Sequence, residues 1–187
     1  MHAFLLSTLA VTLAEIGDKT QLLALMLAVR YRRPWPIVAG ILVATLVNHT
    51  LAAAVGTWVR AVVDTDVLRW IVAGCFFGVA IWTLIPDKLD EDEVEAPIGH
   101  FGVFGVTAIA FFLAEMGDKT QIATAVLGAR YDPLWAVVAG TTLGMLIADV
   151  PAVFAGHLAA DRIPLKAVRI AAALLFAGLG VWILMRG

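Results

Sequence analysis

The sequence predicts an all-α polytopic membrane protein, with six transmembrane helices arranged as two inverted repeats of three helices. Three observations lead to this prediction. Apolar residues make up 61% of the 187 residues and charged residues only 15%, with a mean hydropathy of +0.93. Soluble domains are roughly 45–50% apolar and about 25% charged. The charges are also unevenly distributed, and one motif occurs twice, with its copies 100 residues apart.

Six long apolar segments are separated by short polar ones. We expect membrane spans at 3–29, 35–58, 67–86, 100–129, 134–158 and 165–186. Each segment reaches the roughly 20 residues that a helix needs to cross a bilayer. The first segment is expected to be a true span, because its apolar run is too long for a signal peptide and contains acids. Tryptophans lie near the segment ends, where interfacial aromatics are common: Trp35, Trp58, Trp70, Trp135 and Trp182.

Composition also excludes several classes of function. The net charge of −2 gives no basic surface for nucleic acid, so the lipid bilayer is the expected partner. The single cysteine, Cys75, cannot form an internal disulfide and is expected to be a core residue. No catalytic motif is found, so we predict neither an enzyme nor a bound cofactor. The sequence leaves open whether the chain forms a homo-oligomer.

The repeated motif defines two halves of the chain. Leu13–Gln21 recurs as Leu113–Gln121 with one change, Ile16 to Met116, and 15 of the 28 residues from 13 to 40 equal their partners 100 positions later. Each copy contains three predicted spans, so the second copy enters the membrane from the opposite side, as in many secondary transporters. The predicted organisation is a repeat at 1–86, an acidic linker at 87–99 and a repeat at 100–187.

Orientation is predicted from the basic residues in the loops. Seven Lys and Arg residues lie on the side of the acidic linker, and four lie on the other side. Because cytoplasmic loops carry the excess of positive charge, we expect both termini outside and the linker in the cytoplasm. The linker itself is interpreted as a solvated connector.

Seven charged residues lie inside the predicted spans and away from their ends. Six of them belong to the two motif copies and the seventh is Asp149. An ionised group at the centre of a membrane helix costs at least about 2.5–3.5 kcal/mol, so these groups must pair, face the interior or bind something. Glu15 and Asp18 are three residues apart, which predicts that they share one face of a continuous helix. Inverted symmetry then brings them to Glu115 and Asp118 at the midplane.

Oxygen donors dominate both motif copies. The candidate ion ligands are Glu15, Asp18, Thr20, Gln21, Glu115, Asp118, Thr120 and Gln121. Such hard donors suit Ca²⁺, Mn²⁺ or Mg²⁺, and the motifs hold no Cys or His for Zn²⁺. Clustered carboxylates titrate as a group, so a site that holds either a metal or protons is expected to exchange one for the other.

Other residues of the motifs and spans are expected to support the site. Gly17 and Gly117 allow either close helix packing or a local unwinding that frees carbonyl groups. Lys19 and Lys119 are expected to position the carboxylates or to occupy the empty site. The alternative is that they only form intrahelical ion pairs with Glu15 and Glu115. Weaker candidates are Asn48, His49 and Asp149, of which His49 and Asp149 are repeat partners. A membrane His is also commonly a packing residue.

The pattern Glu-x-Gly-Asp-Lys-Thr, at Glu15–Thr20 and Glu115–Thr120, resembles the signature of the Gdt1 (UPF0016) family. The resemblance covers essentially the whole chain. It implies a cation/proton exchanger for Ca²⁺ and Mn²⁺, with the four motif acids at the ion site and H⁺ as the counter-ion. Compact members of the family are associated with manganese export, which suggests a bacterial inner membrane.

Two other functions fit a six-span chain with a central acidic site. One is a passive divalent-cation channel, and the other is an exporter of a small organic solute. An intramembrane aspartyl protease is disfavoured because Glu15 and Glu115 replace the first glycine of a Gly-x-Gly-Asp motif, and a lysine follows each aspartate.

Overall fold

A computed structural model describes residues 1–85, 102–155 and 165–186, all of whose regular elements are helices. In chain order these are α1 (His2–Glu15), α2 (Lys19–Tyr31), α3 (Pro34–Val62), α4 (Thr65–Thr83), α5 (Gly102–Ala114), α6 (Lys119–Arg130), α7 (Leu134–Ala155) and α9 (Leu165–Arg186). The predicted linker, 87–99, lies outside the described residues. The described chain is therefore all-helical, as predicted.

Four of these helices are long and apolar enough to cross a membrane: α3, α4, α7 and α9. They correspond to the spans expected at 35–58, 67–86, 134–158 and 165–186. The other two expected spans, 3–29 and 100–129, are each divided into two shorter helices, α1 with α2 and α5 with α6. The prediction of one continuous helix through each motif is therefore wrong. In both copies the helix ends just before the motif glycine, and the next helix begins just after it.

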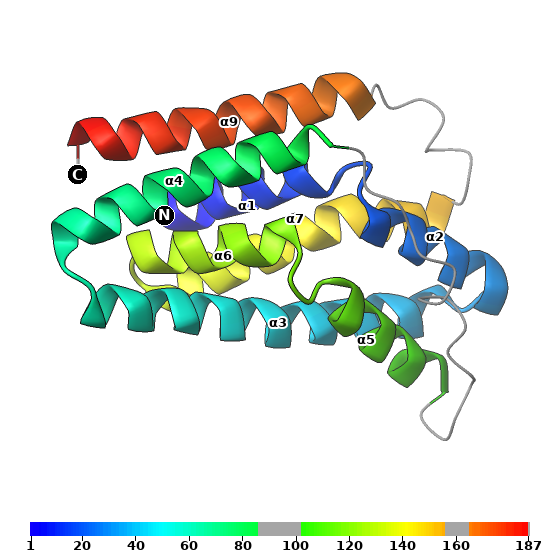
Figure 1. Ribbon diagram of the computed structural model, residues 1–187. Helices are drawn as coiled ribbons and strands as arrows, with labels where there is room; N and C mark the ends of the chain where they lie inside the picture. The colour runs from blue at the N-terminus through cyan, green and yellow to red at the C-terminus, as the bar shows by residue number, and fades with distance from the viewer. Residues whose placement is uncertain (86–101, 156–164, 187) are drawn as a thin grey trace.

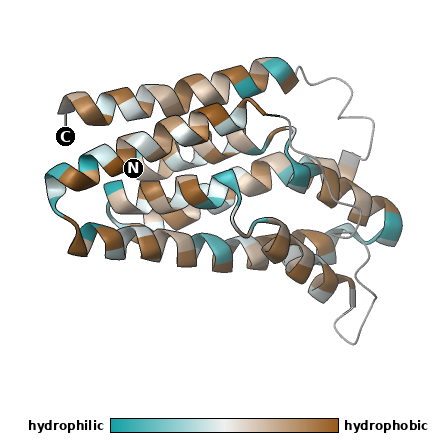
Figure 2. Ribbon diagram, viewed as in Figure 1, coloured by the Kyte–Doolittle hydropathy of each residue, from teal (hydrophilic) through white to brown (hydrophobic). Residues whose placement is uncertain are grey.

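The helices form one bundle in which corresponding helices of the two copies run in opposite directions (Figure 1). α3 runs toward the end of the bundle where α1 begins, whereas α7 runs away from it. α9 ends at that same end, so α1 begins and α9 finishes together. Hydrophobic residues cover most of the helix surface, and the hydrophilic ones form short patches, one in the middle of α3 and others near helix ends and breaks (Figure 2).

Helices of one copy pack mainly against helices of the other. α1 lies on α7, α3 lies on α5 and α6, and α4 pairs with α9. Glycines allow these backbones to approach closely. A Cβ at Gly140 would press on the Phe4 carbonyl of α1, and a Cβ at Gly40 would press on Thr107 of α5. Small residues at such contacts are typical of membrane proteins, where association depends on close packing rather than on water exclusion.

One end of the bundle carries an ion pair between α3 and the connection from α6 to α7. Arg60 contacts the Asp132 carboxylate at 2.7 Å. The hydrogen bond from Arg60 lowers the pKa of Asp132, which lies outside the spanning helices. Both side chains are partly exposed, so this ion pair contributes little to stability. The close packing of the helices matters more.

Gly56 tests this packing directly. A Cβ added at Gly56 would overlap the Ala125 carbonyl of α6, whereas a Cβ at Gly78 of α4 meets nothing within 4 Å. We expect Gly56→Ala to destabilise the protein by about 1–3 kcal/mol through overpacking. Gly78→Ala is expected to be neutral or mildly stabilising, because Ala favours helix by up to about 1 kcal/mol. Thermal unfolding of both purified variants in detergent measures the difference, and equal melting temperatures would contradict this account of the α3–α6 contact.

Candidate ion site at two helix breaks

Both motif copies interrupt a helix in the same way. α1 ends at Glu15 and α2 begins at Lys19, while α5 ends at Ala114 and α6 begins at Lys119. Gly17 has φ +81° and Gly117 has φ +79°, a conformation that residues with a Cβ rarely adopt. Of the two expectations for these glycines, the structure therefore supports local unwinding.

A glutamine side chain accepts a hydrogen bond from the unwound backbone at each break. The Gly17 amide donates to Gln21 Oε1 at 2.9 Å, and Gln21 Nε2 donates to the Ala148 carbonyl of α7. In the second copy the Gly117 amide donates to Gln121 Oε1 at 2.7 Å, and Gln121 Nε2 donates to Asn48 Oδ1 of α3. These hydrogen bonds hold the unwound residues and tie each break to a long helix of the other copy. The role of the two glutamines as ion ligands stays a prediction.

Three motif carboxylates meet at the centre of the bundle. Glu15, Glu115 and Asp118 each offer an oxygen, and these oxygens all lie within 4.8 Å of one another. Glu15 and Glu115 are fully buried, and Asp118 is 4% exposed. The two breaks thus bring acids that are 100 residues apart into a single buried cluster, although they do so without the shared helix face that their spacing predicted.

Threonines orient the two glutamates. Thr20 donates to Glu15 Oε2 at 2.6 Å, and Thr120 donates to Glu115 Oε2 at 2.9 Å. The other oxygen of each carboxylate, Oε1, is buried and accepts no hydrogen bond from the described residues. Buried polar atoms without a partner are rare in proteins. Each glutamate therefore presents an unsatisfied oxygen in a cluster that has the hard donors a divalent cation prefers.

The fourth motif acid is held differently. Asp18 Oδ1 contacts Lys119 Nζ at 2.5 Å, and both side chains are almost fully buried. This contact joins the two copies, so Lys119 pairs across the bundle. The equivalent pair, Lys19 with Asp118, is not formed in the part of the chain that the structure describes. Lys19 is half-buried.

Two of the weaker candidates, Asn48 and Asp149, interact with residues of the two motif copies. Asn48 accepts from Gln121 and donates weakly to the Phe112 carbonyl, at 3.5 Å. Asp149 of α7 is fully buried, neither of its oxygens has a hydrogen-bond partner among the described residues, and it interacts electrostatically with Glu15 and Glu115. His49 is equally buried, and neither ring nitrogen has a partner among the described residues.

One contact at the first break was not anticipated. Arg169 of α9 donates to the Gly17 carbonyl at 3.3 Å. For the predicted orientation, Arg69 and Arg169 counted only among the charges of loops and span ends. In the structure they lie within α4 and α9. Their recurrence at the repeat offset of 100 was the signal that could have singled them out.

Known proteins resemble this chain over nearly its whole length. The family model described as "Divalent cation/proton antiporter GDT1" matches residues 3–91 and 103–187. A Vibrio cholerae protein named "Putative manganese exporter" is 53% identical over 177 residues, which cover 94% of this chain and 87% of that protein. The Saccharomyces cerevisiae "Divalent cation/proton antiporter GDT1" is 26% identical over 94% of this chain and 81% of its own length.

A Synechocystis protein, "GDT1-like protein sll0615", is 32% identical over 94% of this chain and 93% of its own length. No solved structure matches the chain. The family is one of transporters and not of enzymes, and the described chain has the apolar helices of a membrane protein. The match of the family model to both halves shows that the chain belongs to the GDT1 family of divalent cation/proton antiporters.

Proposed function

We propose that this chain exports Mn²⁺ from the cytoplasm in exchange for H⁺, at an ion site formed by Glu15, Glu115 and Asp118. One observation supports the site above all others. Three buried carboxylates from two helix breaks lie within 4.8 Å of one another, and two of them present an unsatisfied oxygen. The family supports the exchange, and the name of the Vibrio cholerae relative supports Mn²⁺ as the exported ion.

Charge balance explains why such a site exchanges ions. Three carboxylates in a buried cluster repel one another, and their charge must be neutralised by a bound cation or by protons. A divalent cation and protons are therefore alternative occupants of one site. Binding of the metal releases protons, and binding of protons releases the metal. Ca²⁺ accepts the same oxygen ligands and is the alternative transported ion.

The helix breaks add backbone groups to the site. The ends of α1 and α5 direct their carbonyl groups toward the break, and the beginnings of α2 and α6 direct their amides toward it. Asp18 and Asp118 are the residues that precede α2 and α6, and neither side chain caps its helix. The positive end of each helix dipole favours these carboxylates, and the freed carbonyl groups are available to a cation.

The topology we propose has six spans. If α1 with α2 forms one span and α5 with α6 another, the four long helices complete six, and the two copies are inverted repeats at 1–86 and 100–187. The opposite directions of α3 and α7 in Figure 1 support this proposal. We place the protein in a bacterial inner membrane, with both termini outside and the linker 87–99 in the cytoplasm.

Asp149 extends the site onto α7. Its two oxygens lack partners, and it interacts electrostatically with both glutamates of the cluster. We assign to it a direct or water-mediated interaction with the transported ion. Asn48 supports the second break through Gln121. We assign His49, the repeat partner of Asp149, to the opposite side of the site. There the first copy has an imidazole where the second copy has a carboxylate.

Transport against a concentration gradient tests the exchange. In proteoliposomes with an acidic interior, we expect Mn²⁺ to accumulate inside above its external concentration, because outward proton flow drives metal entry. Collapse of the pH gradient is expected to stop the accumulation. Parallel measurements with Ca²⁺ determine the preferred ion. Metal flux that ignores the pH gradient would rule out exchange and indicate a passive pathway.

The site assignment is tested by Asp118→Asn. This change removes one charge from the three-carboxylate cluster, and we expect at least a tenfold loss of Mn²⁺ transport with normal insertion. Asp66→Asn, at an exposed acid in the first turn of α4, is the matched control and is expected to transport normally. Equal transport rates for the two variants would refute the assignment.

Lys119 tests the pairing of the two copies. Lys119→Met leaves the buried Asp18 carboxylate without this cation, which typically costs about 3–5 kcal/mol. The double variant Asp18→Asn, Lys119→Met is expected to recover much of that stability, because neither member of this pair then leaves the other's charge buried without it. Lys19→Met is the control and is expected to change the melting temperature little. If Lys19→Met destabilises as much as Lys119→Met, the lysines act alike and the asymmetric pairing is wrong.

The role of Asp149 is tested by Asp149→Asn. Because the carboxylate carries charge toward the cluster, we expect Mn²⁺ affinity to fall by about tenfold, which corresponds to about 1.4 kcal/mol. His49→Asn is the control at the repeat-equivalent position and is expected to change affinity less. Calorimetric titration of purified protein with Mn²⁺ measures both, and unchanged affinity in Asp149→Asn would exclude it from the ion site.

A further inference from the structure

The apolar core consists of two clusters that correspond to each other through the repeat. The first cluster includes Ala10 and Ala14 of α1, Leu127 of α6 and Val137 of α7. The second includes Ala110 and Ala114 of α5, Leu27 of α2 and Ile37 of α3, the partners of those residues at the repeat offset. The clusters differ in one respect. The first contains residues of α4 and α9, and the second, within the described chain, contains none.

α4 and α9 therefore cover α6 and α1, whereas the equivalent surface on α2 and α5 is bare within the described chain. Val126 is 7% exposed and Ala129 is 5% exposed, whereas their partners Met26 and Val29 are 43% and 53% exposed. In the described chain, α4 packs extensively against α6, and α9 packs extensively against α1. The repeat-equivalent pairs, α9 with α2 and α4 with α5, make no such extensive contact there. The α4–α9 pair thus occupies one of two equivalent surfaces.

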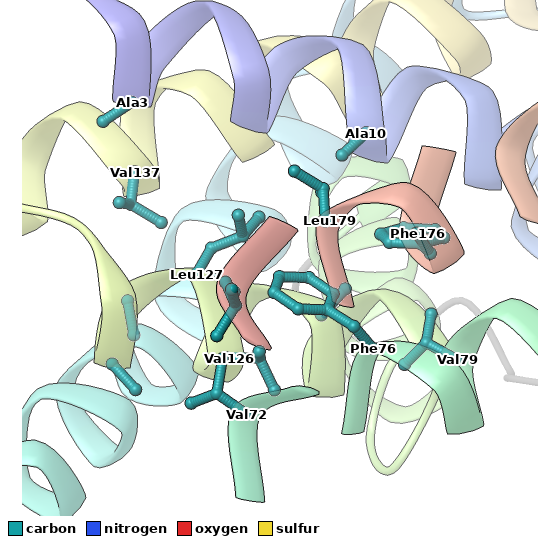
Figure 3. Packing of buried hydrophobic residues seen from close by; sticks show 14 of the residues in the cluster. Ala3, Ala10, Val72, Phe76, Val79, Val126, Leu127, Val137, Phe176 and Leu179 are labelled. Carbon is teal, nitrogen blue, oxygen red and sulfur yellow. The ribbon is translucent and has the colours of Figure 1, made fainter. Parts of the chain in front are cut away.

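The pair is itself nearly symmetric. Phe76 and Phe176 are repeat partners, and their rings stack with centroids 6.2 Å apart at the centre of the pair (Figure 3). α4 and α9 pack along each other as one unit. Exchanging their roles would place α9 on α2 and α4 on α5. Lipid tails are as apolar as these side chains, so the exchange of one apolar surface for another changes the free energy little.

The position of the pair is coupled to the two helix breaks. Leu165 of α9 packs directly against Gly17, and Arg169 donates to the Gly17 carbonyl. At the second break, Gly117 is exposed, and a Cβ added there would meet no atom within 4 Å. Arg69, the partner of Arg169, lines a cavity of about 410 Å³ together with Val72 of α4 and Ala129 of α6. One break is covered and the other is open.

We propose that the α4–α9 pair moves as a unit between these two surfaces and covers one helix break at a time. In the described position α9 closes the first break through Leu165 and Arg169. In the other position α4 closes the second break through Arg69 and the Gly117 carbonyl, and the first break opens. This proposal rests on the exchange function, for which it supplies the movement that exposes the ion site to each side in turn.

Chemical cross-linking in membranes tests the second position. The only cysteine is Cys75, so all variants are made in Cys75→Ala. The pair V72C/V126C joins α4 to α6 and reports the described position. The pair M26C/A172C is its repeat equivalent, joins α2 to α9 and reports the other position. The pair V72C/M26C, which neither position brings together, measures accidental collisions.

With a short, membrane-permeant bifunctional thiol reagent, we expect V72C/V126C and M26C/A172C both to cross-link well above V72C/M26C. Cross-linking of either pair is expected to stop transport. If M26C/A172C reacts no more than V72C/M26C while V72C/V126C reacts fully, the pair has one position and the proposal is wrong. Cross-linking needs no metal, so positive cross-links without Mn²⁺ flux would instead count against the exchange function.

Arginine variants provide a second measurement. Arg169→Ala removes the contact that closes the first break, so we expect the yield of M26C/A172C to rise at least twofold and that of V72C/V126C to fall. Arg69→Ala is expected to have the opposite effect, because it weakens the other position. If both variants shift the two yields in the same direction, the arginines act only on stability and their closing role is excluded.

Discussion

The need to keep carboxylates inside a membrane governs this structure. An ionised acid in an apolar medium is tolerated only with nearby charge or hydrogen-bond donors. Here the compensation comes from several sources, namely the threonines that donate to Glu15 and Glu115, the amine of Lys119 beside Asp18, and the helix ends at both breaks. Among the described residues, one oxygen on each glutamate and both oxygens of Asp149 remain unsatisfied. The incomplete compensation is what leaves room for a cation or for protons.

Much of the remaining architecture follows from this need. A continuous helix satisfies all of its own backbone groups and offers none to an ion. Breaking α1–α2 and α5–α6 at glycines with positive φ releases carbonyl and amide groups, but these groups then need partners of their own. Gln21 and Gln121 supply those partners and also bond to α7 and α3. The same glutamines therefore stabilise the unwound segment and fix its position relative to the other copy.

The sequence predicted the helical class, the four long spans and the motif acids that cluster, because apolar length and repetition are local properties of the chain. It failed at the breaks. The spacing of Glu15 and Asp18 suggested one helix face, but the conformation of Gly17 separates them, and Asp18 turns to Lys119 of the other copy. Contacts between the copies, such as Arg169 with Gly17, depend on packing that no local pattern encodes. The repeat offset did identify the residues involved, though not which of two equivalent contacts is formed.

The proposed duplication in opposite orientations would make both contacts available to one chain. Identical copies would give two positions of the α4–α9 pair with equal free energy. A small free-energy difference, such as that from ion or proton binding, would then shift the pair from one position to the other. The copies differ where the pair docks. Val126 and Ala129 are smaller than their partners Met26 and Val29, so α4 can approach α6 more closely than α9 could approach α2. Closer packing gains dispersion energy, which favours the described position. The copies also differ at Asp149 and His49, which are partners at the repeat offset and carry a carboxylate in one copy and an imidazole in the other.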